Sequence, residues 1–387
     1  MTQAALSRRP SGSVTLRLGR RDVPVVLPRW RDPRLRLAAV ITSLQVLGQV
    51  GLGFKVSIDQ ILISIAAAGG VEVGITYFQK RALIWPASAM LTGNSVAFIL
   101  RASGTHHGDW WSFNGIQYFV LASLLGLLSK YLIQVNGRHL YNPSNLGLVI
   151  VLLAVGPAHV YPQYLWWGSV GVPVALALAV IAAGGLWILR PLRMLPMVAA
   201  FMITFDVLIA ALAGSGHCFA AAWHAGPICR SEYMLGILSS PELLVFVFFM
   251  ISDPRTAPSV EPARVVYGIG IAVLAAGLIL FQPTEYGIKV ALLAALTIVC
   301  STVPLMDWIW RRAQHYPDPP NFRERRAFAE MRILPALRVA VAVLAATCIA
   351  VAIPASVGAL ASNPQALAID LAGSPAGSPP AVGASAQ

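Results

Sequence analysis

Long apolar segments separated by short polar ones dominate the chain. Each is close to the roughly 20 residues that an α-helix needs to cross the hydrocarbon core of a bilayer. The pattern predicts an all-α polytopic membrane protein with about eleven transmembrane helices. The expected helices cover residues 37–54, 58–78, 84–100, 116–133, 143–160, 165–189, 194–214, 233–251, 265–281, 288–308 and 333–357.

Composition agrees with this pattern. Hydrophobic residues make up 57% of the 387 residues, charged residues only 11%, and the mean hydropathy is +0.69. A soluble domain carries about 25% charged residues because its surface faces water. The composition therefore excludes a soluble catalytic domain as the main body and indicates the lipid bilayer as the main environment.

The same pattern divides the chain into five parts. A ten-helix membrane core is expected over residues 36–308. A basic arm without the apolar core of a signal peptide precedes it over residues 1–35, and a basic loop follows over residues 309–332. An additional helix is expected at 333–357. The Ala-, Gly-, Ser- and Pro-rich residues 361–387 are expected to form a disordered tail.

The net charge of +12 becomes informative once the basic residues are placed between the segments. If the N-terminus is cytoplasmic, all but four of the 28 Lys and Arg residues fall on the cytoplasmic side, and the exceptions are Lys55, Arg101, Arg230 and Lys289. This asymmetry is the positive-inside pattern. It predicts a multi-pass protein of the cell (inner or plasma) membrane with an extracytoplasmic C-terminus, and it leaves no reason to expect nucleic-acid binding.

Two of the four cysteines, Cys218 and Cys229, share one loop that this topology places outside the cell. An oxidising compartment favours a disulfide between them. A metal site with His217 and His224 is the alternative, although zinc loops usually show tighter spacing, so no metal is expected. All seven histidines lie in loops or at segment ends, which disfavours haem ligation between facing helices.

Polar residues at the ends of the segments are the candidate functional groups. Residues 130–148 contain Lys130, Arg138 and the run Asn142-Pro143-Ser144-Asn145, which begins the fifth segment. A helix N-terminus facing a membrane cavity binds anionic or carbonyl-bearing ligands through its free N–H groups. The alternative is that Asn and Pro only cap the helix.

A second polar run, residues 250–258, ends the eighth segment and contains Asp253 and Thr256. Both runs are expected on the cytoplasmic side. Ser, Asp and Pro in this order also describe an ordinary helix stop followed by a turn, so this alternative stays open as well.

Together the two runs resemble a family. In and beside the first run are Ser-Lys-Tyr (129–131), Gly-Arg-His (137–139) and Asn-Pro-Ser-Asn (142–145), followed later by Trp-Trp-Gly (166–168). The second run, with the two residues before it, is Phe-Phe-Met-Ile-Ser-Asp-Pro-Arg-Thr-Ala-Pro (248–258). These motifs are similar to those of the D subunit of the Rnf electron-transport complex and the B subunit of the sodium-pumping NADH:quinone oxidoreductase. The nearest branch is the Rnf-D-like (UnbU-type) proteins of enediyne biosynthetic clusters. The resemblance covers roughly residues 80–308.

The resemblance implies two inverted five-helix repeats, as in urea transporters, plus one extra C-terminal helix. It also implies electron transfer through a non-covalent flavin (FMN or riboflavin) or a quinone. The implied cofactor-binding residues are Asn142, Ser144, Asn145, Lys130, Arg138, Asp253 and Thr256. The chain would then be at most a membrane subunit of an oxidoreductase complex. Because no dinucleotide fingerprint follows a strand, redox partner subunits would have to deliver the electrons.

One departure from the family concerns covalent FMN. The family attaches it to a threonine in the loop after the fifth helix. Here that loop, residues 157–164, reads Pro-Ala-His-Val-Tyr-Pro-Gln-Tyr and contains neither Ser nor Thr. We therefore expect no covalent FMN at this position.

A second hypothesis is that the same scaffold passes a small solute or ion. Asp206 in the seventh segment and Glu72 in the second are the candidates for an ion path, because a carboxylate deep in an apolar helix is costly. Each acid could instead simply pair with a neighbouring helix. A purely structural membrane scaffold is the third possibility.

Overall fold

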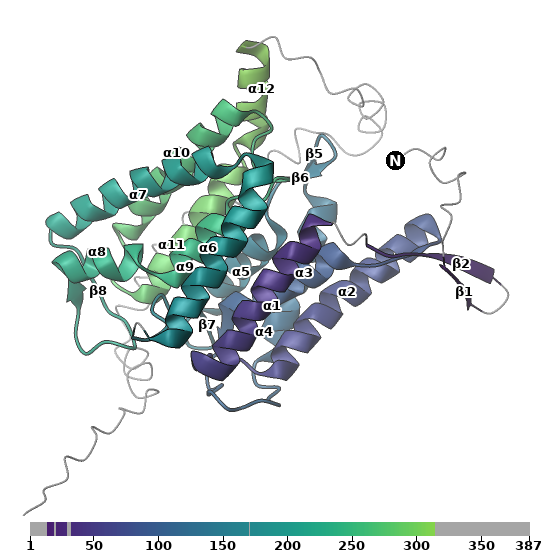
Figure 1. Cartoon of the computed structure of the whole chain (residues 1–387), viewed down its shortest axis with the longest axis horizontal. Helices are drawn as coiled ribbons and strands as arrows, with labels where there is room; N and C mark the ends of the chain where they lie inside the picture. The colour runs from purple at the N-terminus through teal and green to yellow at the C-terminus, as the bar shows by residue number, and fades with distance from the viewer. Residues whose placement is uncertain (1–13, 19–20, 29–31, 170, 314–387) are drawn as a thin grey trace, which may run out of the picture.

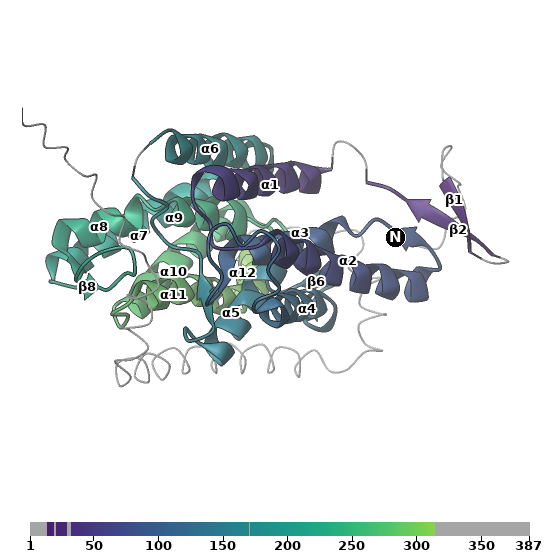
Figure 2. The same cartoon turned by 90° about the horizontal axis from the view of Figure 1, so that it is seen from below.

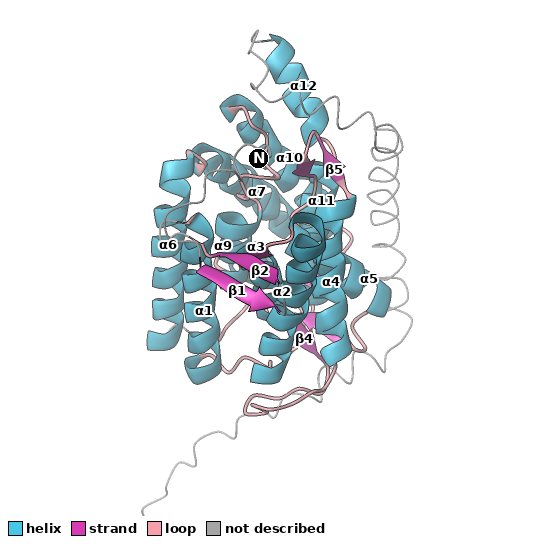
Figure 3. Cartoon of the chain, turned by 90° about the vertical axis from the view of Figure 1, so that its right-hand side faces the viewer, coloured by secondary structure: helices cyan, strands magenta, loops and turns pink. Residues whose placement is uncertain are grey.

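The structure is a computed structural model that describes residues 14–18, 21–28, 32–169 and 171–313. The described part is mostly helical, as predicted (Figures 1 and 3). The expected helix at 333–357 and the tail at 361–387 lie outside the described residues. So do most of the 309–332 loop and the start of the arm.

Helices occur where the first ten apolar segments were expected. In the first half of the chain they are α1 (Pro33–Gly51), α2 (Ile58–Lys80), α3 (Ala87–Ile99), α4 (Ile116–Leu132) and α5 (Pro143–Val155). In the second half they are α6 (Val172–Leu192), α7 (Leu195–Gly214), α8 (Arg230–Leu238), α9 (Pro241–Val245), the π-helical turn η2 (Phe246–Met250), α10 (Glu261–Ile279), α11 (Glu285–Cys300) and α12 (Val303–Ala313).

Four of these helices, α2, α6, α7 and α10, are long and apolar enough to cross a membrane. The number rises to six if two bent pairs, α8 with α9–η2 and α11 with α12, each form one span. The helices α3, α4 and α5 are apolar but shorter. The chain is therefore consistent with a membrane protein.

The eighth expected helix is broken into two. The break falls at Ser239 and Ser240, where α8 and the α9–η2 segment meet at 40°. Pro241 has no N–H to continue the helix and disfavours helical backbone at the residue before it. The Ser240 side chain accepts a hydrogen bond from Leu243 N–H at 3.2 Å and caps the N-terminus of α9.

The fifth expected helix, 143–160, ends early at Val155, and α3 ends at Ile99, one residue before its expected end. After α3, strand β4 (Leu100–Ala102) pairs antiparallel with β7 (Val160–Pro162), which follows α5. Gly156 ends α5 with a φ of +77°, a conformation that favours glycine. The pairing joins the ends of two short helices, and sequence periodicity did not predict it.

Three further sets of short strands were also not predicted. In the arm, β1 (Val14–Leu18) and β2 (Arg21–Val26) form a hairpin, and β2 pairs in parallel with β3 (Leu83–Ile84). Figures 1 and 2 show the hairpin beyond the end of α2. The other two pairs are β5 (Gln134–Val135) with β6 (Arg138–His139), and β8 (Cys218–Phe219) with β9 (Ile228–Cys229).

The two halves of the bundle show corresponding packing. In the first half, α2 packs on α4, α4 on α5 and α1 on α3. In the second half, α7 packs on α10, α10 on α11 and α6 on α9. Contacts of α1 with α6 and of α5 with α11 join the halves, and Figure 2 shows α1 beside α6 along one edge.

Helix ends gather on two opposite sides of the bundle. On the near side, defined by the start of α1, Asp32, Ser88, Lys130, Pro143 and Leu192 line one cleft, so α3 and α5 also begin there and α4 and α6 end there. On the far side, β4 pairs with β7, and Ala220 N–H donates to Pro283 O just before α11. The helix α6 therefore begins on the far side, opposite to α1.

Glycines bring α4 and α5 close together. A Cβ atom on Gly126 would lie 2.3 Å from Pro143 O, and one on Gly147 would lie 2.1 Å from Ala122 O. Both contacts are with backbone, which cannot turn aside as a flexible side chain can. Small residues of this kind let apolar helices pack closely where lipid offers no hydrophobic driving force.

We expect Gly147→Ala to lower the thermal unfolding midpoint of the purified protein in detergent. The added methyl group overlaps the α4 backbone, and such overpacking costs about 1–3 kcal/mol. Gly74→Ala in α2 is the matched control, because no atom lies within 4 Å of its added Cβ. Equal midpoints for the two variants would contradict the proposed close approach.

Candidate functional site

A cleft of about 390 Å³ opens on the near side. Its volume lies within the roughly 300–1,000 Å³ of small-molecule pockets. Its wall is formed by the start of α1, α3, the α4–α5 connection, the end of α6 and the loop after η2. The lining residues are Asp32, Arg34, Ser88, Leu91, Thr92, Ser95, Lys130, His139, Asn142, Pro143, Ser144, Ile188, Leu192, Asp253, Pro254 and Arg255.

The cleft brings together residues from both polar runs. Lys130, Asn142 and Ser144 come from the first run, and Asp253 comes from the second, more than 100 residues later. Four of the seven residues implied as cofactor ligands therefore line one cavity. Leu91, Ile188 and Leu192 add an apolar surface on which the face of a flat ring can lie.

Lys130 is already engaged. Its ammonium donates to Glu72 Oε1 and, at 3.1 Å, to Ser88 Oγ. Glu72 also accepts from Tyr131 Oη at 3.0 Å and from Ala89 N–H at 3.0 Å in the first turn of α3. A carboxylate at a helix N-terminus interacts favourably with the helix dipole. Glu72 thus contacts groups on the neighbouring helices α3 and α4.

Asn142 links the two polar runs directly. Its Oδ1 atom accepts from Asn145 N–H at 3.3 Å and from the Ser144 hydroxyl at 2.9 Å, which caps α5. Its Nδ2 atom donates to Met250 O at 3.3 Å, at the end of η2. The capping alternative therefore describes what Asn142 does at the start of α5, while Asn142 and Ser144 also line the cleft.

The other three implied ligands point elsewhere. Asn145 donates through Nδ2 to Leu293 O at 2.9 Å and to Thr297 Oγ1 at 2.8 Å, which joins α5 to α11. Thr256 is buried in the turn after Asp253. Arg138 donates to the carbonyl oxygens of residues 254, 255 and 257 and holds the loop that carries Asp253.

Charged groups outside the helices line the cleft (Asp32, His139 and Asp253) or, like Arg138, hold the loop beside it. His139 Nε2 lies 3.7 Å from Asp253 Oδ2, across the two polar runs. Partial burial raises the pKa of Asp32, but hydrogen bonds from the Arg34 backbone and guanidinium outweigh it, and the pKa lies below its usual value. Burial lowers the pKa of Arg138, opposed by the carboxylates of Asp307 and Asp253.

Asp206, the other ion-path candidate, lies apart from the cleft in α7. Its Oδ1 atom is buried and has no hydrogen-bond partner within the part of the chain that the structure describes. It differs in this respect from Glu72, whose two oxygens both accept hydrogen bonds.

Sequence reasoning missed a second cluster, on the far side. Four charged residues, each at most 6% exposed, gather there: Arg101 after α3, Glu242 in α9, and Glu285 and Lys289 in α11. Lys289 donates to Glu242 at 2.6 Å and to Gln163 O at 2.5 Å. One sequence signal for this cluster was available: Arg101 and Lys289 are two of the four basic residues that do not follow the positive-inside pattern.

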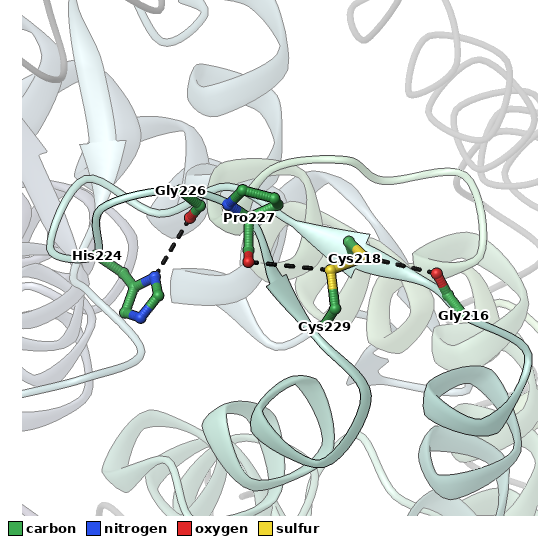
Figure 4. Close-up of a disulfide and its surroundings, with 6 residues drawn as sticks. All are labelled: Gly216, Cys218, His224, Gly226, Pro227 and Cys229. Carbon is green, nitrogen blue, oxygen red and sulfur yellow. Dashed lines mark hydrogen bonds between the residues drawn. A yellow bond between two sulfur atoms is a disulfide. The ribbon is translucent and has the colours of Figure 1, made fainter.

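The loop between α7 and α8, on the far side, is closed by a disulfide between Cys218 and Cys229 (Figure 4). His217 Nδ1 contacts Ser215 Oγ at 2.8 Å, and His224 Nδ1 contacts Gly226 O at 3.3 Å. Within the same loop, Trp223 donates to Glu285 Oε2 at 3.0 Å. The loop therefore covers one acid of the far-side cluster.

Comparison of the sequence with known family models and with curated proteins finds no match.

We expect Lys130→Met to destabilise the protein by about 3 kcal/mol, because removing one partner of a buried ion pair leaves the other charge unpaired. The measurement is the unfolding free energy from a denaturing-detergent titration. Lys80→Met, at an exposed position of α2, is the control and should change it little. Restoration of stability in a Glu72→Gln, Lys130→Met double variant would assign the loss to the pair, and its absence would contradict this assignment.

Proposed function

We propose that this chain is an integral membrane subunit for flavin- or quinone-linked electron transfer, related to the Rnf D and NADH:quinone oxidoreductase B subunits. The observation that carries the proposal is the near-side cleft. Two polar runs that resemble the motifs of that family, separated by more than 100 residues, meet at its wall.

The chemistry of the cleft suits a flat, polar-edged ring. Apolar side chains from α3 and α6 offer a surface for stacking, and amide, hydroxyl and ammonium groups from α4 and α5 offer donors and acceptors at one edge. A flavin or quinone ring needs both, because its carbonyl and nitrogen atoms require hydrogen bonds while its faces are apolar. Lys130 lines the same wall, although its ammonium is paired with Glu72.

We further propose eleven spans in two inverted five-helix repeats plus a C-terminal helix, with a cytoplasmic N-terminus. The packing of α2 on α4, α4 on α5 and α1 on α3 has counterparts in α7 on α10, α10 on α11 and α6 on α9, which supports the repeat. The opposite directions of α1 and α6 support its inversion. Pro86 immediately precedes the short helix α3 and Pro241 is the first residue of the short helix α9, so each of these helices has a proline at its start.

The proposal includes no covalent FMN. The loop that would carry it contains β7, whose Tyr161 ring lies against Tyr286, and it offers no hydroxyl of Ser or Thr. A single flavin or quinone on the near side cannot by itself pass electrons across the whole bundle. Electron donors and acceptors are therefore expected in partner subunits.

The first test is an absorption and fluorescence spectrum of the detergent-purified protein, before and after acid precipitation. We expect a flavin spectrum that moves to the supernatant, because the cofactor is held without a covalent bond. The Asn142→Ala, Ser144→Ala double variant should lose most of the flavin, whereas Ser215→Ala on the far side should retain it.

Two results would contradict the flavin form of this proposal. One is flavin that stays with the precipitated protein, which requires covalent attachment. The other is purified protein that carries no flavin. If such protein also yields no quinone on extraction, the proposed redox function is wrong.

A small-solute or ion transporter on the same scaffold is the second candidate function. It is favoured by Asp206, whose buried Oδ1 atom has no partner among the described residues, in a helix long enough to cross the membrane. An unpaired acid in such a helix typically lies on an ion or proton path.

Under this second function, Asp206→Asn should abolish proton or sodium flux into reconstituted vesicles while the flavin content stays unchanged, because the variant removes the charge and keeps the shape. Asp109→Asn in an exposed far-side loop is the control. Flux equal to wild type in Asp206→Asn would eliminate Asp206 from any transport path.

A further inference from the structure

The seam between α1 and α6 joins the two halves of the bundle at its outer edge (Figure 2). The two helices approach closely there, since a Cβ atom on Gly184 of α6 would lie 2.7 Å from Val40 Cγ2 of α1. Because α6 is long and apolar enough to cross a membrane, the outer face of this seam is the surface that lipid would cover. Its near-side end is then level with the lipid headgroups.

An arginine and a tryptophan meet at that end of the seam. About one turn closer to the near side than the contact of Val40 with Gly184, the Arg36 guanidinium lies over the Trp187 ring, 4.9 Å from its centroid. Trp187 is 53% exposed, as expected for an indole at the level where a membrane meets water. A guanidinium has five N–H donors, more than contact with one ring uses, so Arg36 keeps donors for another group.

A second arginine lies on the same face of α6. Arg190 follows Trp187 by three residues, so the two are neighbours on the helix surface, and Arg190 is exposed. None of the ion pairs formed by the described residues includes Arg36 or Arg190. Asp32, the acid nearest to Arg36 in the sequence, pairs with Arg34 at 3.0 Å. The seam therefore ends in two positive charges to which the described part of the chain offers no carboxylate.

The surface of α6 between these charges and the far side is apolar. From Val172 to Trp187, every exposed residue of this helix is Val, Ala, Leu or Trp. An acyl chain packs against a surface of this kind, and the headgroup attached to it then lies beside the arginines. On the other face of α6, Ile188 and Leu192 line the near-side cleft, so the helix separates the seam from that cleft.

We propose that the near-side end of the α1–α6 seam binds an anionic phospholipid, with its phosphate held by Arg36 and Arg190 beside Trp187 and an acyl chain along α6. Guanidinium groups form strong, charge-assisted hydrogen bonds with phosphate oxygens, and basic sites between membrane helices recognise anionic headgroups. Because α1 and α6 belong to different halves of the bundle, the bound lipid also holds the halves together. This site does not depend on the occupant of the cleft.

The test measures lipid binding to the purified full-length protein in detergent by native mass spectrometry. The probe is phosphatidylglycerol, and phosphatidylcholine with the same acyl chains is the comparison. We expect phosphatidylglycerol to bind at least about tenfold more tightly, which corresponds to about 1.4 kcal/mol, because the choline carries a positive charge that the arginines repel. It should also raise the thermal unfolding midpoint, because a ligand that binds only the folded state stabilises it. Inorganic phosphate should not, since it has no acyl chain.

Variants assign the effect to the two arginines. The Arg36→Gln, Arg190→Gln double variant should lose the preference for phosphatidylglycerol over phosphatidylcholine. Arg190→Gln alone removes an exposed side chain without an ion pair among the described residues, so it should fold normally and bind phosphatidylglycerol several-fold more weakly. Lys80→Gln, which removes an exposed positive charge at the end of α2, is the matched control and should bind as wild type does.

Four outcomes would overturn the proposal. They are equal affinity for the two lipids, equal stabilisation by inorganic phosphate, unchanged lipid binding in the arginine variants, and a Lys80→Gln variant that loses as much affinity as Arg190→Gln. The last result would mean that the positive near side attracts anionic lipid diffusely, without a site at the seam. If the double variant does not fold, Arg190→Gln and the comparison of lipids on wild type still decide the question.

Discussion

The structure depends on satisfying backbone N–H and C=O groups wherever a helix stops inside the apolar core. No water is available in such a core, so each interrupted helix needs partners from elsewhere in the chain. Glu72 of α2 accepts from the first turn of α3. At the other end of α3, Gln163 N–H donates to Ile99 O at 2.6 Å, next to the β4–β7 pairing.

The same requirement explains where the charged residues are found. The short helices α3 and α9 both have a proline at their start, and each has a Lys–Glu pair there, Lys130 with Glu72 and Lys289 with Glu242. Glu242 lies in the first turn of α9, where the dipole favours an acid, and Lys289 also donates to Gln163 O beside β7. These charged side chains therefore stabilise the ends of helices. The same contacts orient them before any ligand binds.

The sequence predicted the location of the helices well and their interruptions poorly. Apolar segments located α1 to α11 because helix formation in lipid depends mainly on a continuous apolar run. Residues 100–102 (Leu-Arg-Ala) and 160–162 (Val-Tyr-Pro) are too short to show a strand pattern of their own, and only their pairing with each other makes them strands. The break at Pro241 carried a local signal, whereas the π-helical turn η2 carried none.

The candidate site shows the same division. Asn142, Ser144, Lys130 and Asp253 were predicted from motifs and line one cleft, but the direction in which Asn145 points depends on α11, which lies nearly 150 residues away in the sequence. The far-side cluster combines residues from three separate segments, β4, α9 and α11, and none of these segments predicts it alone. Only the unexpected side of Arg101 and Lys289 hinted that these residues had a different role.

The loop between α7 and α8 has a consequence for how the start of α11 is covered. Ala220 accepts from Glu285 N–H, the Trp223 indole donates to the Glu285 carboxylate, and the Cys218–Cys229 bond closes the loop that holds both residues. A disulfide persists only where thiols are oxidised. The disulfide thus closes residues 218–229 into a loop that contains both Ala220 and Trp223, and this closure limits how far the cover can move away from Glu285 at the start of α11.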